Sequence, residues 1–193
     1  MRILLISICW MILLLPGCKE PERLPYLQAD TIKIPPFKLF NQDSTIVTEK
    51  DFDGVIYVAD FFFTSCPTIC PVMHRNLLKV YKKYKGNPMV KIASHTIDVK
   101  YDTPSRMKKY ASKLGVEGRQ WEFLWGTRDE IYALAERNYV VSAKEDKEEP
   151  GGFVHAGYLM LVDKQKRLRG AYDGTSDTDV KKLMEDMDVL LKE

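Results

Sequence analysis

Long apolar segments recur along the chain between more polar stretches, and the pattern predicts the strands of a central sheet. VIYVADFFF (55–63) is almost entirely apolar and rich in β-branched and aromatic residues, which is typical of a strand buried on both faces. MVKIASHTID (89–98) and HAGYLMLVD (155–163) predict two further strands. FKLFNQDSTIVT (37–48) alternates apolar and polar positions around a turn, so it predicts a β-hairpin.

Helical periodicity fills the intervals between these strands. Apolar residues at helical spacing predict a helix from Pro71 to about Lys85, and Thr103 before Pro104 marks the start of a second helix that ends at Gly115. Further helices are predicted at about 128–138 and from about Asp177. A short segment precedes each of them, 121–126 before the first and 167–174 before the second. This order predicts an α/β domain with a central mixed sheet and helices on both faces.

The first 18 residues form a separate segment with the pattern of a signal peptide. Arg2 precedes an apolar run from Ile3 to Leu15, which is shorter than the ~20 residues that a membrane span needs. LPGC resembles the bacterial lipobox, so we expect Cys18 to be lipidated; the alternatives are an uncleaved anchor, or secretion with cleavage elsewhere. Residues 19–35 are predicted to be a flexible tether.

These features predict one domain over residues 36–193, held to a membrane by its N-terminal lipid. We expect it in the bacterial cell envelope, facing the extracytoplasmic (periplasmic) side. The balance of 29 Lys and Arg against 27 Asp and Glu gives a net charge of +2, which argues against a nucleic-acid partner.

The compartment also sets the chemistry of the four cysteines. Cys9 is removed with the signal peptide and Cys18 carries the lipid, so Cys66 and Cys70 remain as thiols where disulfides persist. The pair follows a buried strand and precedes a helix N-terminus, which favours the thiolate. A thiolate serves both as a nucleophile and as a metal ligand, so a metal site and a redox pair both stay open. A structural disulfide would close only a very small loop and would therefore stabilise the fold only weakly.

A metal site needs a ligand beyond the cysteines, and the chain has three histidines. His74 lies one helical turn after Cys70 and could reach the metal, or it could simply be solvated. His95 lies in the middle of a strand and is expected to be a hydrogen-bonded core or edge residue. His155 opens the third long strand, and it approaches the cysteines if that strand neighbours the first. Two thiolates and one imidazole suit copper, especially Cu(I), and zinc with an open fourth position is the alternative.

The sequence resembles the Sco/SenC proteins, which deliver copper to cytochrome c oxidase, over roughly residues 37–190. The resemblance rests on DFFFTSCPTICP, TIDVKYDTPSRMKKYASKLG (96–115), WEFLWG and FVHAGYLMLVDKQKRLRGAYDG (153–174). It implies a thioredoxin-like fold with an added N-terminal hairpin, and a metallochaperone that assists the assembly of the copper centre of the oxidase.

The resemblance also implies the site residues. Copper, as Cu(I) or Cu(II), would be held by Cys66, Cys70 and His155, and Asp98 and Asp102 match acidic positions that lie near the metal in the family. Val99 stands where proline is common, which implies a small change of loop shape. The implied partners are a copper-receiving oxidase subunit and other copper or thiol-redox proteins.

Asp60 keeps an enzymatic alternative open. It lies in an apolar strand six residues before Cys66, at the offset where thioredoxin-like reductases carry a buried carboxylate that assists proton transfer. The alternative function is therefore a thiol-disulfide reductase that keeps partner cysteines reduced for metal insertion. Two patterns argue against enzymes: Val154–His155 stands where those reductases carry a cis-proline, and T-S-C lacks the T-x-x-C spacing of a peroxiredoxin-like peroxidase.

Overall fold

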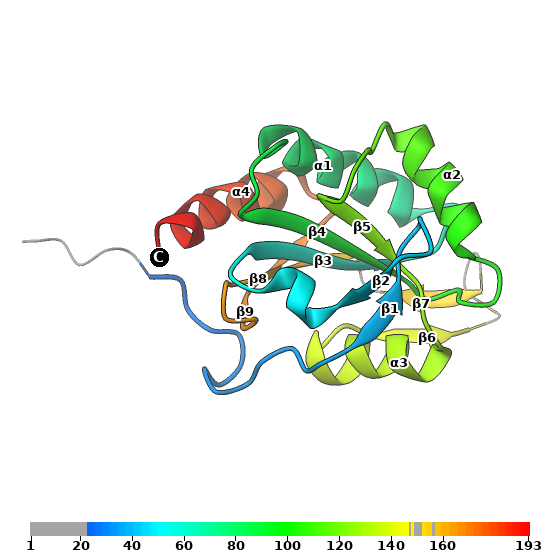
Figure 1. The fold of residues 1–193 in the computed structure, drawn as a ribbon, viewed down its shortest axis with the longest axis horizontal. Helices are drawn as coiled ribbons and strands as arrows, with labels where there is room; N and C mark the ends of the chain where they lie inside the picture. Colours follow the sequence, from blue (N-terminus) through cyan, green and yellow to red (C-terminus); the bar gives the residue numbers. More distant parts are fainter. Residues whose placement is uncertain (1–22, 147, 149–151, 156) are drawn as a thin grey trace, which may run out of the picture.

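The computed structural model describes residues 23–146, 148, 152–155 and 157–193, and only the backbone of 143–145, 154 and 155. Its centre is a five-stranded sheet in the order β5-β4-β3-β8-β9 (Figure 1). The parallel strands are β3 (Ile56–Phe62), β4 (Val90–Thr96) and β5 (Trp121–Leu124), and the antiparallel strands are β8 (Tyr158–Val162) and β9 (Leu168–Asp173). The predicted mixed sheet is confirmed.

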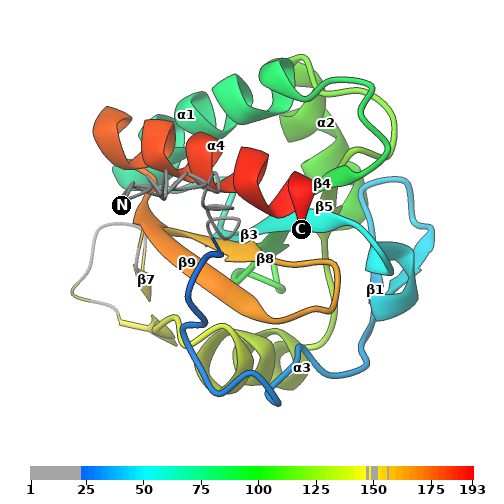
Figure 2. The same cartoon turned by 90° about the vertical axis from the view of Figure 1, so that its left-hand side faces the viewer.

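Helices cover both faces of this sheet, as predicted (Figure 2). α1 (Ile69–Lys83), α2 (Pro104–Leu114) and α4 (Asp177–Lys192) lie on one face, and α3 (Arg128–Ala133) lies on the other and continues into a π-helical turn at Leu134–Asn138. Every residue of β3 is buried between these two layers, which explains why its sequence is apolar except for Asp60.

Local sequence signals set the limits of the helices near the cysteines. The side chain of Thr103 accepts a hydrogen bond from the backbone N–H of Arg106 and caps α2, and Gly115 ends α2 in a left-handed conformation with φ of 72°. α1 begins at Ile69, earlier than the predicted start at Pro71. Since proline is tolerated in a first turn, the helix extends back over Cys70 and places this residue at its N-terminus.

The predicted N-terminal hairpin is also present. β1 (Lys38–Phe40) pairs antiparallel with β2 (Ile46–Thr48), and a 3₁₀ helix at Glu49–Phe52 then leads into β3. Phe40 and Trp125 exchange backbone hydrogen bonds of 2.7 and 2.8 Å, which join the hairpin to the chain just after β5.

The structure differs from the sequence prediction around His155. Two short strands, β6 (Ala143–Glu145) and β7 (Phe153–His155), pair with each other in a separate antiparallel sheet. His155 therefore ends β7 and does not open β8, and the prediction of one strand over 155–163 is wrong. β8 pairs with β3 only from Tyr57 to Ala59. β7, which precedes β8, lies outside the central sheet and pairs with β6.

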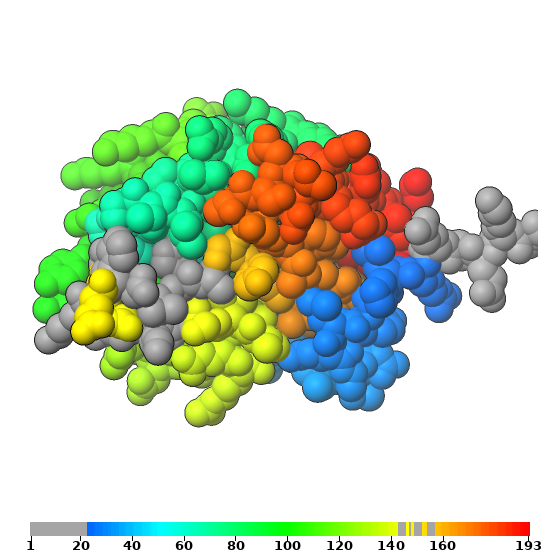
Figure 3. All heavy atoms as spheres, turned by 180° about the vertical axis from the view of Figure 1, so that it is seen from behind, coloured from blue at the N-terminus to red at the C-terminus, as the bar shows by residue number. Residues whose placement is uncertain are grey.

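The N-terminal segment before the hairpin lies along β9 and the end of α4 (Figure 3). Leu27 N–H donates to the Leu168 carbonyl at 3.0 Å, and Ile34 N–H donates to the Lys166 carbonyl at 2.8 Å. The buried Arg169 donates to the carbonyls of Leu24 and Pro25 at 2.5 and 3.2 Å. Residues 24–34 of the predicted tether are thus bonded to the domain.

The predicted signal peptide (1–18), Cys18 and residues 19–22 lie outside the described residues. Within the part of the chain that the structure describes, none of the helices has the length and apolar character that a membrane span requires.

Candidate metal centre

Cys66 and Cys70 lie where β3 leads into α1, at the carboxyl end of the parallel strands. Their side chains are buried, with residue exposures of 7% and 1%, and their sulfurs are thiols rather than a disulfide. The Cys70 backbone N–H, in the first turn of α1, donates to the Cys66 sulfur at 3.5 Å. The fold thus brings both soft donors to one point at a helix N-terminus, as the sequence predicted.

The two thiols differ in their protonation. The hydrogen bond to Cys66 and then burial raise the pKa of the Cys70 thiol well above its usual value. Cys70 therefore keeps its proton, while the Cys66 sulfur accepts hydrogen bonds from the helix terminus.

Contacts on either side of His155 hold this part of the chain beside the cysteine loop. The rings of Phe63 and Phe153 lie 5.0 Å apart, and Phe153 starts the strand that His155 ends. Beyond His155, a side chain added at Gly157 would lie 3.3 Å from the Ile69 side chain, next to Cys70. The backbone of His155 is thus bracketed by residues that flank the two cysteines.

The side chain of His155 lies outside the described residues. Among the described side chains there is no group of three or more His, Cys, Asp or Glu residues that could hold a metal ion. Cys66, Cys70 and His155 fit a soft metal, because the two sulfurs are buried close together and the backbone of His155 lies beside the cysteine loop.

Behind the cysteines, Asp60 belongs to a buried hydrogen-bonded chain. Its carboxylate accepts hydrogen bonds from Ser94 Oγ at 2.5 Å and pairs with His74 Nε2 at 2.9 Å. Trp121 Nε1–H donates to Ser94 Oγ at 2.8 Å, which leaves the serine hydroxyl hydrogen for Asp60. His74 Nδ1 in turn lies 2.8 Å from the hydroxyl of Tyr110 on α2.

These hydrogen bonds determine the role of His74, for which the sequence allowed two possibilities, a metal ligand or a solvated residue. The side chain is completely buried, so it is not solvated. Both ring nitrogens are occupied, one by Asp60 and the other by Tyr110, so neither is available to a metal at the cysteines. Only the spacing of four residues from Cys70, about one helical turn, suggested coordination, and spacing cannot reveal the partners that β3 and α2 supply.

His95 is a core residue, as predicted. It is fully buried, stacks on Phe61 with ring centroids 4.9 Å apart, and its Nδ1 lies 3.3 Å from the Asp60 carbonyl. Its Nε2 has no hydrogen-bond partner among the described residues. Burial lowers the pKa of His95 to about 4, so the ring is neutral at neutral pH.

Asp102 connects the cysteine loop to the rest of the fold. Its buried carboxylate accepts hydrogen bonds from the Thr64 backbone N–H and the Thr96 hydroxyl, both at 2.8 Å, and from the Thr64 hydroxyl. Arg106 lies 3.4 Å from the same carboxylate. This geometry makes Asp102 a brace between β3, β4 and α2. Asp98 is also buried, in the loop that follows β4.

Some residues of this region carry no sequence signal. Tyr110 is one aromatic residue in an amphipathic helix, and Thr64 and Ser94 are ordinary strand or loop residues. Their contacts arise from three separate elements, so only the tertiary structure reveals them.

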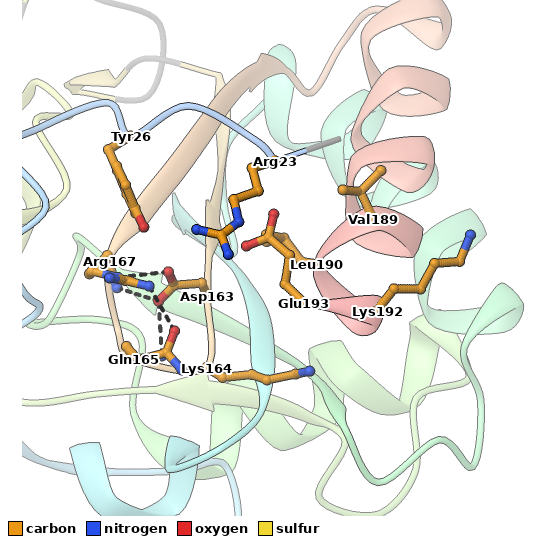
Figure 4. Close-up of a pocket in the computed structure, with 10 residues that line it drawn as sticks. All are labelled: Arg23, Tyr26, Asp163, Lys164, Gln165, Arg167, Val189, Leu190, Lys192 and Glu193. Atoms are coloured by element: carbon orange, nitrogen blue, oxygen red, sulfur yellow. Dashed lines mark hydrogen bonds and ion pairs between the residues drawn. The ribbon is translucent and has the colours of Figure 1, made fainter. Parts of the chain in front are cut away.

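A pocket of about 680 Å³ lies away from the cysteines, between the N-terminal segment and the end of α4 (Figure 4). Arg23 and Tyr26 face Asp163 and Glu193 there. Asp163 pairs with Arg167 there, and the buried Arg169 bridges Asp163 and Glu193 beside the N-terminal segment.

A five-stranded mixed sheet with a cysteine pair at the end of its first central strand defines a thioredoxin-like protein. The SCO1/SenC family model matches residues 26–192, and the chain belongs to this family.

Solved structures agree with this assignment. A SCO1/SenC family lipoprotein from Bacillus anthracis is 28% identical, with a TM-score of 0.76 over 83% of this chain and 95% of that one. BsSco, a member of the Sco family of cytochrome c oxidase assembly proteins with a disulfide switch, is 26% identical, with a TM-score of 0.74 over 89% and 98%. Copper-bound ScoI of Bradyrhizobium japonicum is 25% identical, with a TM-score of 0.68 over 82% and 99%.

Proposed function

We propose that this protein binds copper through Cys66, Cys70 and His155 and delivers it to a copper-receiving subunit of cytochrome c oxidase. The observation that carries the proposal is the bracketing of His155: Phe153 contacts Phe63, and Gly157 lies against Ile69. Copper-bound relatives of the same fold support the choice of metal. Copper is here the cargo of the protein and not a resident catalytic group.

The protonation of the cysteines suggests an order of binding. Cys66, which accepts hydrogen bonds at the start of α1, would contact the metal first. Cys70 would follow with loss of its thiol proton, because a metal binds the thiolate. The imidazole of His155 would complete a low-coordinate site suited to Cu(I). Release to the recipient would then proceed by exchange of these ligands for those of the partner.

We also propose that the protein is lipidated on Cys18 and held in the bacterial cell envelope, with the domain on the extracytoplasmic side. The apolar N-terminal run and the LPGC sequence support this placement, and a family member from Bacillus anthracis is a lipoprotein. Metabolic labelling with a radioactive fatty acid tests it. Label that is lost in Cys18→Ala supports the anchor, and unlabelled wild-type protein contradicts it.

Competition with a Cu(I) chelator tests the proposed ligands. The reduced wild-type chain should retain one copper per molecule, and His155→Ala should lose at least about tenfold in affinity, because removing one bonding ligand costs more than 1.4 kcal/mol. Tyr158→Ala, an exposed neighbour at 47% exposure, is the matched control and should bind like the wild type. Equal affinities of His155→Ala and wild type would remove His155 from the site.

The buried Asp60–His74 pair favours a second function, the reduction of disulfides in partner proteins. The Cys66 thiolate would attack a partner disulfide to form a mixed disulfide. Cys70 would then lose its proton and attack the Cys66 sulfur, which releases the partner as a dithiol and leaves a Cys66–Cys70 disulfide. In this proposal the buried Asp60–His74 pair would assist the loss of the proton from Cys70.

Turnover of a disulfide substrate, measured against pH, tests this second function. Asp60→Asn should reduce the rate of the step in which Cys70 attacks and should change its pH profile, while the alkylation of Cys66 should continue. Absence of turnover in the wild-type chain rejects the reductase function and leaves copper binding intact.

A further inference from the structure

The outer face of α2 carries a row of cations next to the cysteine loop. Arg106, Lys108, Lys109 and Lys113 are all exposed, and α2 contains no acidic residue. Lys108 pairs with Asp43 at 2.7 Å. Lys109 and Lys113 form no ion pair with the residues that the structure describes, so their charge is available to a partner.

These cations line a groove of about 450 Å³ that begins at the cysteine loop. Thr64, Arg106, Lys109, Tyr110 and Lys113 lie along it, and none of the described residues that line it is acidic. Arg106 is paired with the Asp102 carboxylate at 3.4 Å, so Lys109 and Lys113 supply the excess positive charge of the groove, in a chain whose net charge is only +2. The spacing i, i+3, i+7 keeps the three cations on one side of the helix.

The groove is fixed rigidly to the cysteines. Arg106 Nε–H donates to Thr64 Oγ1 at 2.6 Å, and Thr64 lies two residues before Cys66. The Asp102 brace bonds the same Thr64 through its backbone N–H at 2.8 Å. A partner seated in the groove would therefore be held at a constant position relative to the Cys66 sulfur.

Copper transfer by ligand exchange requires that the acceptor's ligands reach the metal while Cys66 and Cys70 still hold it. The surface around the cysteine loop must then be covered by the acceptor. We propose that the groove along α2 is the docking surface for an acidic face of the copper-receiving protein, an inference that rests on the proposed copper delivery. Opposite charge would accelerate the encounter and orient the acceptor towards Cys66.

The position of the groove favours a protein over the membrane surface. Residues 24–34, which lead from the proposed anchor, lie along β9 and the end of α4. In Figure 1 the C-terminus lies on the left, whereas α2 and β7 lie on the right. The groove is thus at the end of the molecule opposite to the anchored segment.

The rate of copper transfer tests the inference. The copper-loaded full chain, in neutral detergent, is mixed with the copper-free soluble domain of the oxidase subunit from the same cell, at low and high salt. Lys109→Glu/Lys113→Glu should slow the second-order transfer by about tenfold or more at low salt and remove most of its salt dependence. Lys109→Gln/Lys113→Gln should show a smaller effect in the same direction.

Lys82→Glu/Lys192→Glu is the matched control, since both lysines are exposed, both lie in the last turn of a helix as Lys113 does, and the charge change is the same. It should transfer copper within about twofold of the wild type. Unchanged transfer in the α2 variants, or equal slowing in the control, overturns the docking surface. So does an α2 variant that loses binding to anionic vesicles and still transfers normally. A wild-type chain that transfers no copper refutes the proposed function itself, which separates the two failures; Cu(I) affinity should be unchanged in all variants.

Discussion

At the scale of single residues, the same chemical group has three different roles in the three histidines. His74 is held by two partners in the core, and His95 has one nitrogen bonded and one without a partner among the described residues. His155 ends a short strand outside the central sheet. The surroundings of each ring, rather than its distance in sequence from Cys70, therefore determine whether it can serve as a ligand.

His95 makes stability depend on pH. The folded protein binds its proton with a pKa of about 4, against 6.5 for an unperturbed histidine. Between these values the unfolded chain binds more protons, so acidification should destabilise the fold by up to about 1.4 kcal/mol per pH unit from this residue. His95→Phe should reduce that slope between pH 6.5 and 4, as measured by urea unfolding. An identical slope in the variant and the wild type would contradict the assignment.

The Asp60–His74 pair should show strong coupling. His74→Phe leaves the buried carboxylate with fewer donors and should lower the free energy of unfolding by about 3 kcal/mol. Asp60→Asn/His74→Phe should lose less than the sum of the single variants, because no unpaired charge remains. Urea denaturation of the four proteins measures the coupling. Strictly additive losses would mean that the pair is not formed in solution.

At the scale of elements, α1 packs closely against the segment that follows His155 and against the end of β9. A side chain at Gly174 would meet Met73 Cγ at 2.6 Å and the Gly157 carbonyl at 2.9 Å. Gly174 N–H also donates to that carbonyl at 2.7 Å. The absence of side chains at these glycines lets the segment after His155 approach the helix that carries Cys70.

Alanine at the two glycines should therefore have graded effects. Gly174→Ala should destabilise the protein by about 2 kcal/mol, because a backbone atom and a buried methionine must move. Gly157→Ala should cost less, since its tightest contact is with the end of the Ile69 side chain at 3.3 Å and its contact with Thr175, at 3.7 Å, is an ordinary one. Thermal unfolding ranks the two variants, and the reverse order would show that the segment is not packed as described.

The sequence was sufficient for the elements that have strong local signals. The almost entirely apolar strand at 56–62, the capped helix at 104–114 and the hairpin at 38–48 follow from apolar patterning and caps. The pair β6 and β7 was missed because three-residue strands beside a charged loop have no period to read. For the site, the cysteine pair was predictable from local sequence, whereas the partners of Asp60 depend on contacts between distant elements.

At the scale of the whole molecule, the N-terminal segment and the cysteine loop lie at opposite ends of the sheet. Arg169 is buried and joins the backbone of residues 24 and 25 to Asp163 and to Glu193. With this segment bonded to the domain, little chain remains between Cys18 and the fold. The proposed copper site would then face away from the membrane, towards a partner.

Replacing Arg169 should release that segment. Arg169→Met removes the donors to Leu24 and Pro25 and leaves the buried Asp163 carboxylate with fewer partners, so it should cost about 3 kcal/mol. Amide hydrogen exchange at Leu27 and Ile34 should accelerate. Lys164→Met, which loses only its bond to the Leu191 carbonyl, is the control and should leave these amides protected. Unchanged protection in Arg169→Met would show that other contacts hold the segment.

The central claim is that copper is bound by two sulfurs and one imidazole nitrogen from Cys66, Cys70 and His155. X-ray absorption at the copper edge of the Cu(I)-loaded chain counts these ligands directly. The wild type should show two sulfur neighbours and one histidine nitrogen, and His155→Ala should keep the sulfurs and lose the imidazole signal. An imidazole that persists in His155→Ala, or a wild-type spectrum with sulfur ligands alone, would contradict the account.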